Sequence, residues 1–220
     1  MRLVNNRKND SIVEREIAKF LNDNLYSQKD IFKEFRRTDE KQEQVSGSDL
    51  ILSTSDGKLK DVIVDEKVAS RYANKVLNTF SLELSFIDRR GEERSGWFID
   101  ESKKTEYYLL GWINRAEIPY IEHKHQYDTN SITSENIKSM DWCLVSRKKL
   151  FSFLEEKGWT IDRMIMQTEK IRVNKCVATR DFIDDVSFRY SEKYIEKPIN
   201  LMLQKKTYIN LSDYHGRITV

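Results

Sequence analysis

Two aspartates and a lysine stand at the ends of two short apolar runs in the first third of the chain. Asp49 opens the run Leu50–Leu52, and Asp65 and Lys67 close the run Val62–Val64. A charge buried beside an apolar core is costly unless it is paired with an opposite charge or bound to a ligand. Charged residues at these strand ends therefore predict a site with chemistry of its own.

The spacing of these residues favours a site for a divalent cation. Side chains alternate along a strand, so Asp65 and Lys67 share one face. The turn signal at Ser55–Lys58 predicts a hairpin that puts Asp49 beside Asp65. Two adjacent carboxylates repel, which makes Mg²⁺, with Mn²⁺ as a substitute, the natural third component. Lys67 would orient a water molecule or stabilise charge on a phosphate, so the set suits hydrolysis of a phosphodiester.

The residues around these two runs resemble the PD-(D/E)XK nuclease superfamily, which includes restriction endonucleases and archaeal Holliday-junction resolvases. In that pattern an aspartate on one strand is followed by (D/E)-x-K on the next, and the matching residues are Asp49 and Asp65-Glu66-Lys67 in "GSDLIL" and "VIVDEKVA". Ser48 stands where the family has proline. The resemblance implies Mg²⁺-dependent cleavage of DNA, with Asp49 and Asp65 as metal ligands and Lys67 as a catalytic residue.

The same resemblance implies further site residues and a fold. A helical glutamate ahead of the strands often completes the site, and Glu16 matches it; Gln44 matches a glutamine found near the motif in many members. The later "WCLVSRKKLFSFLEEKG" resembles the strand and helix that close the common core. The implied fold is α/β, with a restriction-endonuclease-like core over 11–157 and a mixed central sheet flanked by helices.

Two alternatives stay open. In a second register Asp65 would be the first aspartate and Glu83 the second acid, with Ser85 where lysine usually stands. Glu83 is also a candidate metal ligand from a neighbouring strand in the first register. The other alternative is a non-catalytic module on a degenerate nuclease fold, which binds DNA or protein and keeps the acids as remnants.

The elements that must position these residues follow from hydrophobic spacing. Ser11 and Glu14 have capping-box spacing, and the apolar residues after them recur at helical spacing, which predicts a helix over 11–25 with Glu16 inside its apolar arc. Further strands and one helix are expected at Phe80–Phe86, Gly96–Ile99, Tyr107–Ile113, Trp142–Val145 and, for the helix that Gly158 ends, Arg147–Lys157. The residues 114–139 read as irregular.

Composition bounds the rest. With 220 residues and 39% apolar content, the chain fits a single domain, 1–220, in which 158–220 is a C-terminal extension of unknown role. The net charge of +2 neither announces nor excludes DNA as a partner, because a local basic groove can be offset elsewhere. Lys104, Arg147 and Lys148 belong to basic clusters that would bind phosphates if they line one groove.

The remaining signals are negative. The isolated residues Cys143 and Cys176 give neither a disulfide framework nor metal spacing, and His123 and His125 have no third ligand nearby in the sequence. There is no apolar run of about 18 residues, so no membrane partner is expected. No signal-peptide pattern is evident at the N-terminus, which predicts a cytoplasmic protein. The oligomeric state stays open, with a homodimer among the options.

Overall fold

The computed structural model of the chain describes residues 7–38, 47–174 and 185–220. The chain divides into two compact units that are interleaved along the sequence. We call Asn6–Leu77, Lys104–Arg147 and Ser212–Val220 the six-stranded unit, and Asn78–Lys103 with Lys148–Leu211 the four-stranded unit. This division does not follow the expected boundary between a core over 11–157 and an extension over 158–220.

The six-stranded unit is built on one mixed sheet with the strand order β1-β2-β3-β6-β9-β12. Neighbouring strands are antiparallel except β3 and β6, which run parallel. The strands are β1 (Phe32–Arg37), β2 (Leu50–Thr54), β3 (Val62–Val68), β6 (Tyr107–Ala116), β9 (Ile137–Ser146) and β12 (Tyr214–Thr219). The hairpin β2–β3 has the position that the turn signal and the two apolar runs predict.

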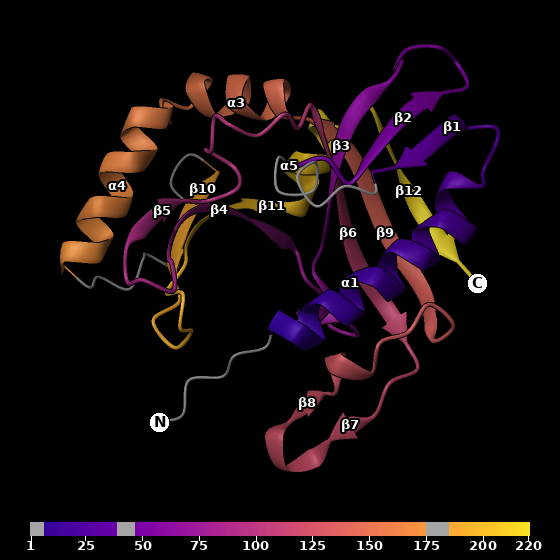
Figure 1. Cartoon of the computed structure of the whole chain (residues 1–220), viewed down its shortest axis with the longest axis horizontal. Coiled ribbons are helices and arrows are strands. Elements are labelled where there is room, and N and C mark those ends of the chain that lie inside the picture. Colours follow the sequence, from indigo (N-terminus) through magenta and orange to yellow (C-terminus); the bar gives the residue numbers. More distant parts are fainter. Residues whose placement is uncertain (1–6, 39–46, 175–184) are drawn as a thin grey trace. The chain divides into compact units, whose positions relative to one another are not determined.

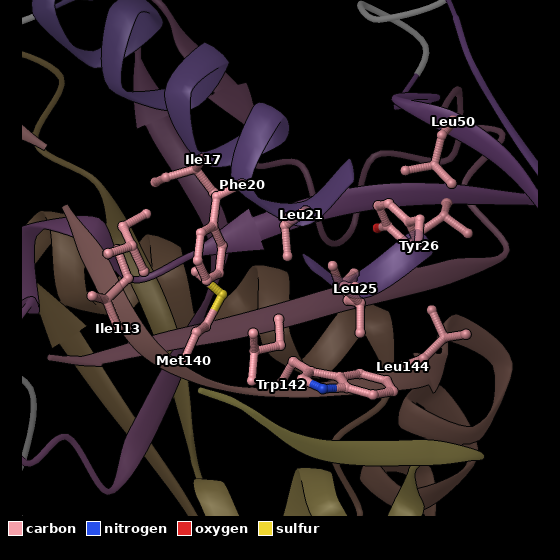
Figure 2. Packing of buried hydrophobic residues seen from close by; sticks show 14 of the residues in the cluster. Ile17, Phe20, Leu21, Leu25, Tyr26, Leu50, Ile113, Met140, Trp142 and Leu144 are labelled. Carbon is pink, nitrogen blue, oxygen red and sulfur yellow. The ribbon is translucent and has the colours of Figure 1, made fainter. Parts of the chain in front are cut away.

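A helix and a π-helical turn pack on one face of this sheet (Figure 1). Helix α1 spans Arg7–Leu21 and continues directly into the π-helix η1, Asn22–Tyr26. Buried side chains from both segments, among them Phe20 and Leu25, point toward Trp142 and other residues of the sheet (Figure 2). The helix starts before Ser11, so the expected capping box does not mark its N-terminus.

Short elements complete this unit. They are the 3-10 helices η2 (Ser70–Tyr72), η3 (Glu122–Lys124) and η4 (Thr129–Ser131) and the two-stranded hairpin β7 (Tyr120–Ile121) with β8 (Gln126–Tyr127). The region 114–139 is therefore less irregular than its polar composition predicts, because β6 and β9 extend into it from both sides.

The four-stranded unit has its own sheet, in the order β10-β11-β4-β5, in which every neighbouring pair is antiparallel. Its elements are β4 (Thr79–Ile87), β5 (Glu93–Ser95), α3 (Arg147–Glu156), α4 (Ile161–Asn174), β10 (Val186–Tyr190), β11 (Ile199–Gln204) and α5 (Lys205–Leu211). The strict alternation in β4 buries Leu82 and Leu84 as predicted. Gly158, with φ of 76°, follows the end of α3, also as predicted.

The structure is a mixed α/β protein whose curled mixed sheet is flanked by helices. One connection differs from the expected order of elements: the chain between β3 and its parallel neighbour β6 leaves the six-stranded unit and forms β4 and β5 of the other unit. No helix in the described part of the chain is long and apolar enough to cross a membrane.

Candidate active site

Asp49 is held against strand β3 by its backbone and by its side chain. Leu50 pairs with Val64 in the antiparallel β2–β3 ladder, and the Asp49 N–H donates to the Val64 carbonyl oxygen at 2.9 Å. The Glu66 backbone N–H donates to Asp49 Oδ2 at 2.7 Å. Asp49 therefore lies beside the strand segment that carries Asp65 and Lys67.

Asp65 and Lys67 form an ion pair on β3. Lys67 Nζ donates to Asp65 Oδ1 at 2.5 Å. The Asp65 side chain is only 5% exposed, whereas that of Lys67 is 29% exposed, so solvent reaches the lysine side chain more than it reaches the aspartate. We call Asp49, Asp65 and Lys67 the carboxylate cluster. It contains two acidic side chains and one basic side chain.

Burial and the excess of negative charge in the carboxylate cluster raise the pKa of Asp49. Burial raises the pKa of Asp49, and the charge of Asp65 raises it further; Lys67 and the Glu66 N–H act in the other direction, and the balance is a pKa of about 7. A carboxyl group in this state gives up its proton near neutral pH. The energetic conflict between two close carboxylates is what a bound cation would relieve.

Lys67 stays protonated at neutral pH. Burial acts to lower the pKa of Lys67, but Asp65 and Asp49 outweigh it, with a further contribution from Glu14, and the pKa of Lys67 is raised. Lys67 is therefore an ammonium group that donates hydrogen bonds and carries positive charge. It is not placed to act as a general base.

The helical carboxylate that acts on Lys67 is Glu14, two residues before the one we expected. Glu16 Oε2 accepts a hydrogen bond from the Ser134 N–H at 2.9 Å, and this bond lowers the pKa of Glu16. Helix phase explains the difference. Residues four apart lie on one side of a helix, and the side that contacts the motif is the one with Ala18 and Asn22, to which Arg37 binds. Glu14 is four residues before Ala18, whereas Glu16 is not in that row.

Tyr108 lies next to Asp65, and the charge of Arg147 acts on Tyr108. Tyr108 is the partner of Asp65 in the parallel β3–β6 ladder and is fully buried. Burial raises the pKa of Tyr108, the positive charge of Arg147 lowers it, and the negative charge of Asp65 raises it. The Arg147 N–H also donates to the Glu106 carbonyl oxygen at 2.8 Å. Arg147, predicted to bind nucleic acid, therefore acts electrostatically on the same Tyr108 hydroxyl group as Asp65 does.

The middle residue of the D-x-K triplet, Glu66, has partners that sequence reasoning did not find. Its carboxylate accepts hydrogen bonds from Tyr26 OH, at 2.7 Å, and from Arg37, which binds both oxygens. Arg37 Nε and Nη2 also donate to Asn22 Oδ1 at 2.9 and 2.8 Å. We call Asn22, Tyr26, Arg37 and Glu66 the Arg37 cluster. An acid within a strand that follows the apolar run Val62–Val64 was the available signal that a partner existed.

The other predicted residues do not join the carboxylate cluster in the same way. Glu83 lies on β4, whose neighbours are β11 and β5, so the register with Asp65 and Glu83 on adjacent strands does not occur. Lys104 is exposed just before β6, and Lys148 is exposed on α3 in the four-stranded unit. Gln44 lies outside the described residues.

The described residues contain no group of three or more His, Cys, Asp or Glu side chains arranged to hold a metal ion. Two carboxylates nevertheless suit Mg²⁺, which keeps several water ligands and is commonly bound through one or two carboxylates and substrate phosphates. Comparison of the chain with protein-family models, with curated proteins and with solved structures found no match in any of the three.

Proposed function

We propose that this protein is a metal-dependent nuclease that hydrolyses phosphodiester bonds in DNA. The observation that carries the proposal is the carboxylate cluster: two adjacent acids, one with its pKa raised to about 7, beside a protonated lysine near the end of a partly buried strand. A conflict of charge at a partly exposed position is typical of functional sites. A structural ion pair would need only one acid.

The order of elements is a second support. Helix α1, the antiparallel strands β1, β2 and β3, and the parallel strand β6 follow one another as in the helix–three-strand–helix–strand order of the PD-(D/E)XK superfamily. The departure is that a segment of the four-stranded unit stands where the superfamily has a helix. We therefore propose a restriction-endonuclease-like core with an insertion after β3.

Asp49 and Asp65 are the residues that would hold Mg²⁺. The ion would supply a water of lowered pKa and would neutralise charge on the phosphate. Lys67 would place its ammonium group against the phosphate oxygens, or orient the attacking water, because Glu14, Asp49 and Asp65 keep it protonated. Glu14 takes the place that we first gave to Glu16.

Positive side chains near the cluster would hold the DNA backbone. Arg147 is the best placed, because its charge acts on Tyr108, the ladder partner of Asp65. Its planar guanidinium group matches the geometry of phosphate oxygens. Contacts of this kind give affinity without sequence preference. Lys104, which is in the same unit as the carboxylate cluster, is exposed and would add charge.

One observation favours the non-catalytic alternative. The 2.5 Å ion pair between Lys67 and Asp65 is what a degenerate site would keep, and no group of three acids accompanies it among the described residues. On this alternative the protein binds DNA or another protein through the same surface and cleaves nothing. The two functions differ in the role of Asp49, which would bind the metal ion in a nuclease and would be a remnant in a binding module.

The deciding experiment is incubation of the purified protein with linear, nicked, branched and single-stranded DNA in the presence of Mg²⁺ or Mn²⁺. We expect cleavage of at least one DNA form, dependent on metal and lost in Asp49→Asn. The matched control is Lys58→Ala, which removes a lysine from an exposed ion pair with Asp56 in the same hairpin. Wild-type protein that leaves every DNA form intact with both metals would refute the nuclease and favour the binding module.

A further inference from the structure

Arg37 connects three elements of the six-stranded unit through one guanidinium group. From strand β1 it donates to the Ala18 carbonyl oxygen of α1 at 3.1 Å, to Asn22 of η1, and to both carboxylate oxygens of Glu66 on β3. The Arg37 side chain is 24% exposed and that of Glu66 is 10% exposed. The contact set is too large and too well shielded for an incidental surface pair.

Arg37 crosses a strand to reach Glu66. It pairs with Leu50 on β2, and Leu50 pairs with Val64 on β3, so its side chain extends over β2 to a residue two positions further along β3. The planar fork of arginine can bind a carboxylate with two bonds while its other N–H groups bind elsewhere, which lysine cannot do. This position therefore requires arginine in particular.

The π-helix η1 supplies two of the partners. Asn22, its first residue, accepts two bonds from Arg37, and Tyr26, its last, donates to Glu66 and lies with its ring 5.7 Å from the Arg37 guanidinium carbon. A π-helical turn is rare and less favourable than an α-helical one, and such turns are frequent at functional sites. Here the turn brings its two ends onto one ion pair.

The Arg37 cluster is connected to the carboxylate cluster at two points, Glu66 and Ala18. Glu66, fixed by Arg37 and Tyr26, directs its backbone N–H at Asp49 Oδ2. Ala18, bound by Arg37, lies one helical turn after Glu14, whose charge acts on Lys67. Fixing Glu66 and Ala18 therefore fixes where Asp49 and Glu14 lie relative to Lys67.

We propose that Arg37 is a positioning residue of the site: it locks helix α1 and strand β3 together and, through Glu66, holds the Asp49 carboxylate in place. The inference rests on the proposed function for its catalytic consequence, but its structural part stands without it. The competing explanation is that the Arg37 cluster only stabilises the fold. The two explanations differ in what happens at the Glu66 N–H and at Asp49 when the protein stays folded.

The first test uses metal-free, ¹⁵N-labelled protein and needs no activity. Arg37→Lys keeps the charge and removes the fork, and we expect the Glu66 amide to lose hydrogen-exchange protection by about tenfold or more, since local openings set such rates. Arg217→Lys is the matched control, because Arg217 makes a two-bond pair with Asp141 on the same sheet, 2.5 and 3.1 Å, with an exposed side chain. Unchanged protection of the Glu66 amide in Arg37→Lys would overturn the proposal.

Tyr26→Phe provides a second variant if Arg37→Lys does not fold. It removes only the hydroxyl that donates to Glu66 and leaves the ion pair intact. We expect a smaller loss of Glu66 amide protection, in the same direction. Protection equal to wild type in Tyr26→Phe would show that the Arg37 cluster does not hold in place the Glu66 N–H, which donates a hydrogen bond to Asp49.

The second test applies to cleavage. Residues that orient metal ligands typically change activity or metal affinity by about 10- to 100-fold when they are replaced. We expect Arg37→Lys to lower kcat in that range, to leave KM for DNA nearly unchanged and to raise the Mg²⁺ concentration that gives half-maximal stabilisation against heat. A kcat equal to that of Arg217→Lys would overturn the positioning role. Absence of cleavage in the wild type would instead refute the proposed function, and the amide result would still decide the structural part.

Discussion

Strand β3 carries two ionic clusters on consecutive residues, and they differ in their balance of charge. Asp65 and Lys67 belong to the carboxylate cluster, in which two acids share one ammonium group and the pKa of Asp49 is raised to about 7. Glu66, between them, belongs to the Arg37 cluster, in which one acid meets one guanidinium group. Alternation of side chains along the strand separates the two.

This difference separates the carboxylate cluster, which is the candidate active site, from the Arg37 cluster, which positions it. In the Arg37 cluster both Glu66 oxygens accept hydrogen bonds, so a buried charge is fully compensated. In the carboxylate cluster the compensation is incomplete, and Asp49 bears the cost. An uncompensated acid is useful only where something binds it. The comparison therefore predicts opposite responses to mutation in the two clusters.

The largest expected effect is on stability, in the Arg37 cluster. Arg37→Met leaves the Glu66 carboxylate buried without its partner, which should cost about 3–5 kcal/mol of unfolding free energy. Arg37→Met combined with Glu66→Met should recover much of that loss. Arg217→Met, from an exposed pair, should cost less than about 1 kcal/mol. Denaturant unfolding measures all three, and equal costs for Arg37→Met and Arg217→Met would break the comparison.

The second effect is on cleavage, in the carboxylate cluster. Lys67→Ala should lower kcat by about a hundredfold or more, the scale of losing one group that stabilises developing charge. DNA affinity should change little, because phosphate contacts spread over the surface supply most of it. Single-turnover cleavage and a separate binding assay measure the two quantities. Cleavage undiminished in Lys67→Ala would keep a nuclease and reject Lys67 as its catalytic lysine.

The third effect has the opposite sign to the first. Without metal, Asp49→Asn should raise the unfolding free energy at pH 8 by on the order of 2 kcal/mol, less than the full pKa difference implies because the side chain is partly exposed. The pKa of Asp49 is raised from 3.8 to about 7, so the folded wild type gains stability from proton uptake below pH 7 and loses it as the pH rises. The advantage of Asn should therefore vanish near pH 4 and be complete above pH 7.

We expect bound metal to reverse the stability advantage of Asp49→Asn over the wild type. Mg²⁺ or Mn²⁺ that binds the folded state raises the thermal midpoint by mass action, and the gain should be larger at pH 8 than at pH 6 because Asp49 is ionised there. Asp49→Asn should abolish the gain, and Lys58→Ala should keep it. A midpoint that does not move with millimolar metal at pH 8 would remove the metal from the proposal.

The smallest effect concerns one hydroxyl group. Tyr26→Phe removes a neutral donor from Glu66 while Arg37 keeps both of its bonds, so the cost to unfolding free energy should be about 1 kcal/mol. Equilibrium unfolding in urea would detect it. A cost close to that of Arg37→Met would show that the phenol, and not the guanidinium group, compensates Glu66.

The local part of the site could be predicted from the sequence. The turn at Ser55–Lys58 and the alternation of charge after Val64 were enough to predict that Asp49, Asp65 and Lys67 lie close together. Hairpins are encoded by residues close in sequence, so neither a register across distant strands nor a helix orientation was needed. The chemistry that this group performs stays a proposal.

The sequence did not single out Glu14, the helical acid whose charge acts on Lys67. We gave Glu14 a capping role with Ser11, because their spacing fits a helix start, and assigned Glu16 to the site because it lies inside the apolar arc and matches the helical glutamate of the family. The helix starts at Arg7, so Ser11 and Glu14 lie inside it. Inside the helix, the four-residue spacing from Glu14 to Ala18 and Asn22 places Glu14 on the side of the motif.

Partners that are distant in sequence could not be predicted at all. Arg37 and Glu66 are 29 positions apart, on strands separated by β2, and a charged residue in a polar stretch carries no information on its cross-strand partner. The pairing of β12 with β9 is similar, since residues 147–213 separate the two strands. Such contacts depend on the whole sheet being assembled.

The interleaving of the two units has a consequence for how the chain folds. The parallel pairing of β3 with β6 closes a loop over residues 69–106, and β12 can join β9 only after residues 147–213 have been passed. Loop-closure entropy makes such long-range pairings slow to form. No single cut in the chain separates the units, since each is made of segments on both sides of the other. We therefore expect the six-stranded sheet to be completed late in folding, with its edge at β9 open to mispairing until β12 arrives.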